Sequence, residues 1–330
     1  MARHPNPLVG RNDLLRSYPA ARRSKRVFEA AVLDSAFDVV LSEMRRQGLF
    51  ELCGMVFKGG TALRKFHFGH KSRFSFDLDF DTEEGAAEIV AEQLEGYSSH
   101  GFSYAFNERR THQLLKIDSP LFADGFYEAK IDFSHRGCWL PPDERTPLSS
   151  PVTAGRVWEE AATIPTMRLE ENVAEKLSRW QGRQLVRDLY DIAEIAPSLT
   201  DLALIAKLYV LKSHRNYSAT LPSRRPASAA RLLGPVAAAA QPSDFELADL
   251  VQPHASADRD KTTVIRDTLN VVERLSQALD THIRDPSLRE IAADTGTLEW
   301  RVDQEIQSLQ EQHRQSPAVQ SPPSVAATNT

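Results

Sequence analysis

An alternation of apolar and polar residues with a period of two runs from Arg73 to Asp81 and is the clearest pattern in this chain. It places phenylalanine and leucine side chains on one face and polar side chains on the other, as in a strand that buries only one face. The polar face carries Asp77 and Asp79, whose Cα atoms would lie about 6 to 7 Å apart. Carboxylates at that separation can converge on one or two divalent cations, and ligands made only of oxygen favour Mg²⁺ or Mn²⁺ over zinc.

A turn of adjacent glycines precedes this strand. Gly59 and Gly60 follow Val56 and Phe57, which we expect to end a first strand, and Thr61 opens a helix. Adjacent glycines let the backbone approach a phosphate closely, and the amide groups at a helix start attract the same anion. The short spacing between this turn and the aspartate strand predicts that the two features hold different parts of one nucleoside triphosphate.

Two further alternating stretches, at 114–118 and 126–134, predict a hairpin that supplies another carboxylate. Attack on an α-phosphate needs a base or a second metal ion beside the acceptor hydroxyl, so an acidic side chain is expected on a neighbouring strand. Asp132 lies on the polar face of the second stretch, and Asp118 in the first stretch is the other candidate. Either could instead be an ordinary surface residue of an edge strand.

Helical spacing dominates from about residue 165 onward. In the predicted helix 169–180, Lys176 lies on or beside the apolar stripe, and Asp188 faces inward in the next helix, 185–192. An inward cation and anion can pair with each other or face a ligand, and the pattern leaves both interpretations open. Asp191 is expected on the helix surface, paired with an arginine one turn away.

The same periodicity predicts the rest of the organisation. We expect a basic N-terminal segment (1–26), an α/β core (27–164), a helical domain that completes the site (165–314) and a disordered tail (315–330). Further helices are predicted at 27–49, 83–94, 202–212, 245–251 and 261–283, and a short strand at 102–106.

Composition adds few constraints. The chain has 330 residues, of which 41% are hydrophobic and 26% charged, as in ordinary globular proteins that can contain two domains. Two cysteines suggest neither a disulfide framework nor a zinc cluster. Because no apolar run approaches 20 residues and no signal core follows the N-terminus, we expect a cytoplasmic protein without a membrane partner.

The net charge of −5 argues against a basic, nucleic-acid-binding surface over the whole protein, yet basic residues are concentrated in two segments, 11–26 and 207–231. These segments could guide a polyanionic acceptor such as tRNA to the triphosphate, or could simply solvate helix faces. The candidate RNA contacts are Arg22, Arg23, Lys207, Lys212 and Arg215. The stretch 288–306 has the spacing of a helix-turn-helix, but its acidic residues would repel DNA phosphates, so a packing hairpin is favoured and DNA is not expected as a partner.

Taken together, these motifs resemble the AbiEii-type nucleotidyltransferase toxins, including the mycobacterial MenT toxins, within the DNA polymerase β-like superfamily. The resemblance covers about residues 27 to 215, with a continuation to about 290. It rests on Gly59, Gly60, Thr61, Leu63, Arg73, Ser75, Asp77 and Asp79, and on the stretches 130–134 and 171–191.

This resemblance implies an α/β (α+β) nucleotidyltransferase core with a mixed sheet, followed by a helical C-terminal domain. It also implies a bacterial toxin that transfers a nucleotidyl group from a triphosphate to RNA, in some branches to the acceptor end of tRNA, which would block translation. A separately encoded antitoxin is the implied partner.

The implied roles follow the motif positions. Asp77 and Asp79 hold the metal ions, and Asp132 completes the metal site or activates the acceptor hydroxyl. Gly59, Gly60 and Thr61 cradle the phosphates, while Ser75 orients one or accepts one as a regulatory modification. Arg73 and Lys176 offset the charge of the triphosphate, and Asp188 lies near the active site. Two other functions stay open: a transferase for a protein or an aminoglycoside-like small molecule, and a nucleotide-binding protein without catalysis.

Overall fold

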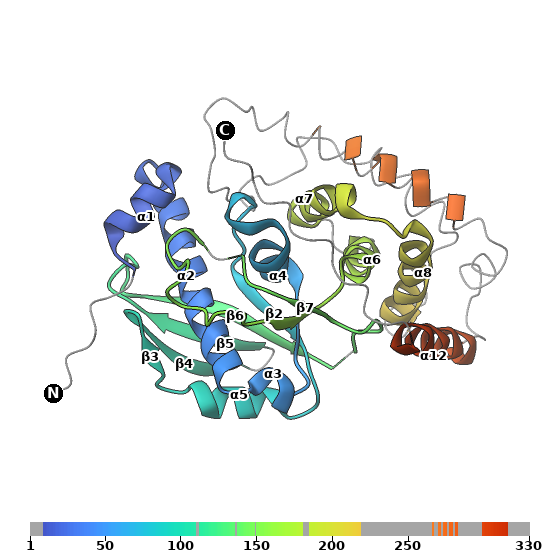
Figure 1. The fold of residues 1–330 in the computed structure, drawn as a ribbon, viewed down its shortest axis with the longest axis horizontal. Coiled ribbons are helices and arrows are strands. Elements are labelled where there is room, and N and C mark those ends of the chain that lie inside the picture. The colour runs from blue at the N-terminus through green and yellow to red at the C-terminus, as the bar shows by residue number, and fades with distance from the viewer. Residues whose placement is uncertain are drawn as a thin grey trace.

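The computed structural model describes residues 9–109, 112–135, 137–148, 150–180, 185–218 and 299–315, with scattered positions between 266 and 282. Its centre is a mixed eight-stranded sheet with the order β3-β4-β5-β6-β2-β1-β8-β7 (Figure 1). The strands are β1 (Val56–Lys58), β2 (Asp77–Asp81), β3 (Ser98–Ser99), β4 (Phe102–Arg109), β5 (His112–Asp118), β6 (Phe126–Ser134), β7 (Asp143–Arg145) and β8 (Ile164–Thr166).

Strand β2 lies in the middle of this sheet, antiparallel to β1 and parallel to β6. The register places Lys58 of β1 beside Asp79 and places Asp132 of β6 on the other side of Asp79. The predicted hairpin is confirmed, because β5 pairs antiparallel with β6 from Gln113 to Asp118. The mixed sheet thus brings three strands with polar side chains next to one another.

The helices are α1 (Arg11–Ser17), α2 (Lys25–Arg46), α3 (Leu49–Leu52), α4 (Gly59–Leu63), α5 (Ala86–Leu94), α6 (Leu169–Trp180), α7 (Val186–Ile195), α8 (Leu202–Ser218) and α12 (Glu299–Gln315). Helix α2 begins at the cap residue Ser24, whose Oγ accepts a hydrogen bond from the amide of Val27. It is buried along most of its length against the apolar face of the sheet, where Leu78 and Phe80 are fully buried.

A second apolar core joins α6, α7 and α8 with Leu63 and Trp139 of the sheet region. Figure 1 shows α6, α7, α8 and α12 gathered on the side of the molecule opposite α1. Ile306 and Leu309 of α12 belong to this core, as expected for a packing helix. The helix predicted at 245–251 and the tail beyond Gln315 lie outside the described residues.

The strand predicted from Arg73 to Asp81 begins only at Asp77, so the prediction was wrong for Arg73 and Ser75. The segment before Asp77 belongs to no helix or strand and pairs with none of the strands in the described part of the chain. Its backbone instead meets a buried side chain, because Arg64 Nη1 donates to the carbonyl oxygens of Ser72 and Arg73. Arg73, Phe74 and Ser75 are all buried, so the alternation in the sequence matches neither a strand ladder nor an alternation of burial at that point.

Other boundaries moved for local reasons. The helix predicted at 83–94 starts at Ala86, after Gly85 with φ +82°. The helix predicted at 27–49 ends at Arg46, because Gly48 adopts φ +70° and starts α3. The strand predicted at 102–106 extends to Arg109, because β5 pairs with it from Ser103 to Arg109.

Candidate active site

The glycine turn and the aspartate strand are in direct contact. Gly59 has φ +78°, and a Cβ atom there would lie 2.2 Å from Oδ2 of Asp79. A Cβ atom on Gly60 would lie 2.6 Å from Nη2 of Arg73 and 2.9 Å from Oγ of Ser75. Only glycine leaves room for these side chains, so the turn and the polar groups form one site.

Hydrogen bonds fix Asp77 at the start of β2. Thr61 Oγ1 donates to the backbone oxygen of Asp77 at 2.5 Å, and Ser75 Oγ donates to Asp77 Oδ1 at 2.8 Å. Thr61 and Ser75, which the sequence placed in the site, therefore both donate hydrogen bonds to Asp77, the first aspartate of the pair. Asp77 is held in one orientation from two sides.

The arginine and lysine predicted for the triphosphate meet two carboxylates of α7. Arg73 donates through Nε and Nη2 to both oxygens of Asp191, at 2.6 and 2.5 Å. Lys176 Nζ lies 2.9 Å from Asp191 and 3.2 Å from Asp188. All four side chains are buried. Asp188 Oδ2 is also buried and has no hydrogen-bond partner in the described residues.

This network corrects the expectation that Asp191 is a surface residue, because only 3% of Asp191 is exposed. Burial works to raise its pKa, but the charges of Arg73 and Lys176 outweigh burial and lower it. Burial likewise works to lower the pKa of Lys176, and the carboxylates of Asp191 and Asp188 reverse that effect. The shifted pKa values of Arg73, Lys176 and Asp191 therefore all favour the charged forms of these three side chains. Sequence spacing missed Asp191, because its main partner is 118 residues away.

Asp132 lies in register beside Asp79 on β6, as predicted, but its carboxylate is half-exposed. Its Oδ2 accepts a hydrogen bond from Lys130 Nζ at 2.9 Å. Burial works to raise the pKa of Asp132, and the Lys130 contact outweighs it and lowers the pKa. Asp118, the other candidate, pairs with Lys116 on β5, two strands away from β2. Of the two, Asp132 is the one beside the aspartate pair.

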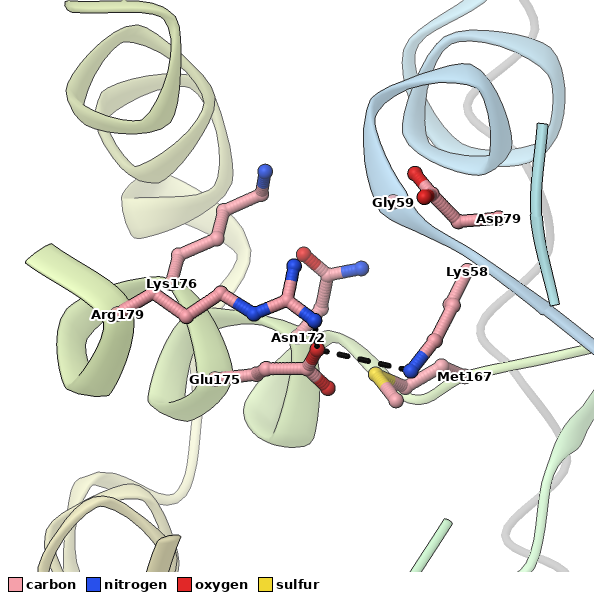
Figure 2. A pocket seen from close by; sticks show the side chains of 8 residues that line it. All are labelled: Lys58, Gly59, Asp79, Met167, Asn172, Glu175, Lys176 and Arg179. Carbon is pink, nitrogen blue, oxygen red and sulfur yellow. Dashed lines mark ion pairs between the residues drawn. The ribbon is translucent and has the colours of Figure 1, made fainter. Parts of the chain in front are cut away.

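A pocket opens between β1, α4 and α6, and its lining includes residues that the sequence reasoning missed. Figure 2 shows them as Lys58, Gly59, Asp79, Met167, Asn172, Glu175, Lys176 and Arg179. The α6 members recur at positions 172, 175, 176 and 179, which is the spacing of one helix face. That spacing was readable in the sequence around Lys176 and would have pointed to Glu175 and Arg179.

Charges of both signs alternate in this pocket. Glu175 Oε1 lies 3.6 Å from Lys58 Nζ and 2.5 Å from Arg179 Nη2. Burial works to raise the pKa of Glu175, but Lys58 and Arg179 outweigh it and lower the pKa to about 2. Burial and the charge of Asp77 raise the pKa of Asp79 to about 7, although the charges of Arg179 and Lys58 work to lower it. A negative charge on Asp79 is thus costly until a cation joins the site.

The donor set suits a divalent cation that is shared with a substrate. In the described part of the chain, no three His, Cys, Asp or Glu side chains are grouped so as to hold a metal ion. Mg²⁺ is commonly bound by one or two carboxylates together with substrate phosphates and waters, rather than by a cage made of protein alone. Asp77 and Asp79 fit that pattern.

The candidate RNA contacts have different surroundings. Arg22 and Arg23 are exposed beside α1, whereas Lys207 Nζ lies 2.6 Å from Glu305 of α12. Lys212 is buried, with its Nζ 2.8 Å from Glu171 and 4.3 Å from the ring centre of Trp139, so its assignment to an exposed basic surface was wrong. Hydrophobic neighbours on α8 draw Lys212 into the second core, where Glu171 neutralises it. The side chain of Arg215 lies outside the described residues.

No helix among the described residues has the length and apolar character needed to cross a bilayer.

Comparison with known proteins gives a family and a similar structure. The family model described as nucleotidyl transferase AbiEii toxin, type IV toxin-antitoxin system, matches residues 40–281. The chain is similar to the structure of MenT4, a nucleotidyltransferase toxin of Mycobacterium tuberculosis H37Rv, with 25% identity and a TM-score of 0.69 over 91% of this chain and 99% of that one. A second structure, JHP933 from Helicobacter pylori, has 16% identity and a TM-score of 0.41 over 74% of this chain and 94% of that one. Curated protein sequences give no match.

Proposed function

Because the chain belongs to the AbiEii family of nucleotidyltransferase toxins of type IV toxin-antitoxin systems, we propose that its pocket transfers a nucleotidyl group from a nucleoside triphosphate to the acceptor end of tRNA. The observation that carries this proposal is the contact between the glycine turn and Asp79 at the mouth of a pocket whose opposite wall bears Lys176 and Arg179. Phosphates and a divalent cation would fit between these walls.

Asp77 and Asp79 would hold Mg²⁺ or Mn²⁺, which supplies Lewis-acid stabilisation of charge on the phosphates. The close approach of Gly59 to Asp79 leaves the backbone amides of Gly60 and Thr61 as candidates to contact the phosphates from the α4 side. Ser75 and Thr61 keep Asp77 oriented, as their hydrogen bonds indicate. Arg73 and Lys176 supply positive charge behind the phosphates, and their ion pairs with Asp188 and Asp191 keep both cations in place.

In the proposed reaction, the acceptor hydroxyl oxygen attacks the α-phosphorus. A new phosphorus–oxygen bond forms, the bond from the α-phosphorus to its bridging oxygen breaks, and pyrophosphate leaves. The proton of the hydroxyl passes to Asp132, which we place on the acceptor side of the site because its carboxylate is half-exposed beside Asp79. A nucleotide added at the acceptor end of tRNA would occupy the hydroxyl that carries the amino acid and so would block translation.

The exposed basic residues beside α1, including Arg22 and Arg23, are our candidates for contacts with the tRNA backbone. We place the reaction in the cytoplasm, where tRNA and triphosphates meet, and expect a separately encoded antitoxin to oppose it. The boundaries of the basic segment, core, helical domain and tail at 26, 164 and 314 remain predictions.

The test incubates the purified protein with Mg²⁺, total tRNA and each labelled triphosphate in turn, and follows the label on a denaturing gel. Asp77→Ala is the inactive variant, and Asp118→Ala is the matched control, because Asp118 is a paired surface carboxylate of the same sheet. We expect label at tRNA size with the unmodified chain and with Asp118→Ala only, lost on addition of a chelator. Absence of label from RNA with all four triphosphates would refute an RNA acceptor and direct the search to proteins and small molecules.

A further inference from the structure

We propose that Arg179 contacts the β- and γ-phosphates of the bound triphosphate, an assignment that rests on the proposed function of the pocket. Arg179 lies in the last turn of α6, one turn beyond Glu175, and lines the pocket opposite Gly59 and Asp79. Figure 2 shows its guanidinium group reaching across the pocket wall toward Asn172.

Exposure distinguishes Arg179 from the other cations of the site. The exposed fractions of the Lys58, Arg73 and Lys176 side chains are 7%, 6% and 10%, whereas that of Arg179 is 44%. Arg73 already uses Nε and Nη2 on Asp191 and Nη1 on the carbonyl oxygen of Phe74. Arg73 thus uses all its guanidinium nitrogens on protein acceptors, whereas the half-exposed side chain of Arg179, which pairs with Glu175, can also meet a ligand that enters from solvent.

The chemistry of the side chain fits phosphate oxygens. A guanidinium group is planar and offers five N–H donors that match a phosphate in a two-point contact. The contact between Nη2 and Glu175 Oε1, at 2.5 Å, anchors the group at the pocket. Burial works to lower the pKa of Arg179, but Glu175, Asp79 and Asp188 outweigh it and raise the pKa, so the positive charge is retained.

The position of Arg179 in the pocket also determines which phosphates of the triphosphate it can contact. The glycine turn and the aspartate pair lie on the wall formed by β1, β2 and α4, where the α-phosphate must react. Arg179 lies on the α6 wall across the pocket, so the part of the triphosphate that extends away from the aspartates would reach it. Its charge would then also stabilise the departing pyrophosphate.

The experiment measures the affinity of each nucleoside triphosphate and each monophosphate by calorimetry in the presence of Mg²⁺. Variants Arg179→Met and Arg179→Lys are compared with Arg46→Met, which removes a similar intrahelical ion pair, with Glu43 on α2, away from the pocket. Thermal unfolding of each variant checks the fold. Because the side chain of Arg179 is half-exposed, we expect Arg179→Met to keep its unfolding temperature.

We expect Arg179→Met to weaken triphosphate binding by about tenfold or more and monophosphate binding by less than about twofold, with Arg179→Lys in between and Arg46→Met unchanged. Equal effects on both nucleotides would overturn the assignment of Arg179 alone and would favour a contact with the nucleoside or the α-phosphate. Unchanged triphosphate binding would also overturn it and would favour a contact with the acceptor. Absence of triphosphate binding by the unmodified chain would overturn the proposed function and this assignment together.

Discussion

A buried ion-pair network beneath the glycine turn gives the sharpest stability prediction. Asp34 of α2 accepts hydrogen bonds from Arg64 Nε at 2.9 Å, from Arg64 Nη2 at 3.1 Å and from Lys65 Nζ at 3.1 Å. Lys65 also donates to Asp38 at 2.7 Å. The exposed fractions of these four side chains are between 2% and 4%. Two basic side chains therefore face two carboxyl groups out of contact with water.

Asp34→Asn keeps the shape of the side chain and removes one negative charge, which leaves two buried cations facing Asp38 alone. Breaking a buried pair on one side costs roughly 3 to 5 kcal/mol. Because asparagine retains one acceptor oxygen, we expect the lower limit, about 3 kcal/mol of unfolding free energy. That loss corresponds to a fall in the unfolding temperature of about 4 °C for a chain of this size.

The assay is urea unfolding followed by circular dichroism, with thermal unfolding alongside. Glu29→Gln is the control on the same helix, since Glu29 pairs with Lys25 at 3.7 Å on the surface, and we expect less than about 1 kcal/mol there. If Asp34→Asn lost no more stability than Glu29→Gln, the network would not be held together by its buried charges.

Two other predictions use the same site and its surroundings. Gly59→Ala should abolish nucleotidyl transfer in the labelled-tRNA assay, because its Cβ would displace the Asp79 carboxylate. The control Gly85→Ala, with a similar φ of +82° and open space around it, should lose stability but keep activity. Equal activity of the two variants would contradict the predicted clash. Burial and Arg145 lower the pKa of His67 from its ordinary 6.5 to about 4, so the unfolded chain binds a proton that the native chain does not, and stability falls as pH drops from about 6.5 to about 4. Between pH 7 and pH 5, the unmodified chain should lose about 2 kcal/mol more unfolding free energy than His67→Gln, as measured by unfolding both proteins at the two pH values. If the unfolding free energies of the two proteins changed equally with pH, His67 would already be protonated in the native chain.

Local patterns in the sequence predicted the elements that depend on short-range spacing. The period of two around Asp77 and Asp79, the glycine turn and the inward positions of Lys176 and Asp188 all reflect which face of an element is buried, and periodicity reports that directly. The hairpin of β5 and β6 followed for the same reason.

What the sequence could not predict depends on partners that are far apart along the chain. The i,i+4 rule paired Asp191 with an arginine of its own helix, whereas the fold pairs it with Arg73. Lys212 was assigned to a basic surface, because nothing in its neighbourhood along the chain indicates that Glu171 and Trp139 lie across from it. Whether a charged side chain is buried or exposed can be predicted only when its partner is known.

The distance along the chain between Arg73 and Asp191 also has a consequence for the newly made protein. The ribosome must add 118 residues after Arg73 before Asp191 exists. At a synthesis rate of roughly 5 to 20 residues per second, that takes on the order of 10 s. For most of that interval the nascent chain has its aspartate pair but lacks α7, so the buried ion pair between Arg73 and Asp191 cannot yet form.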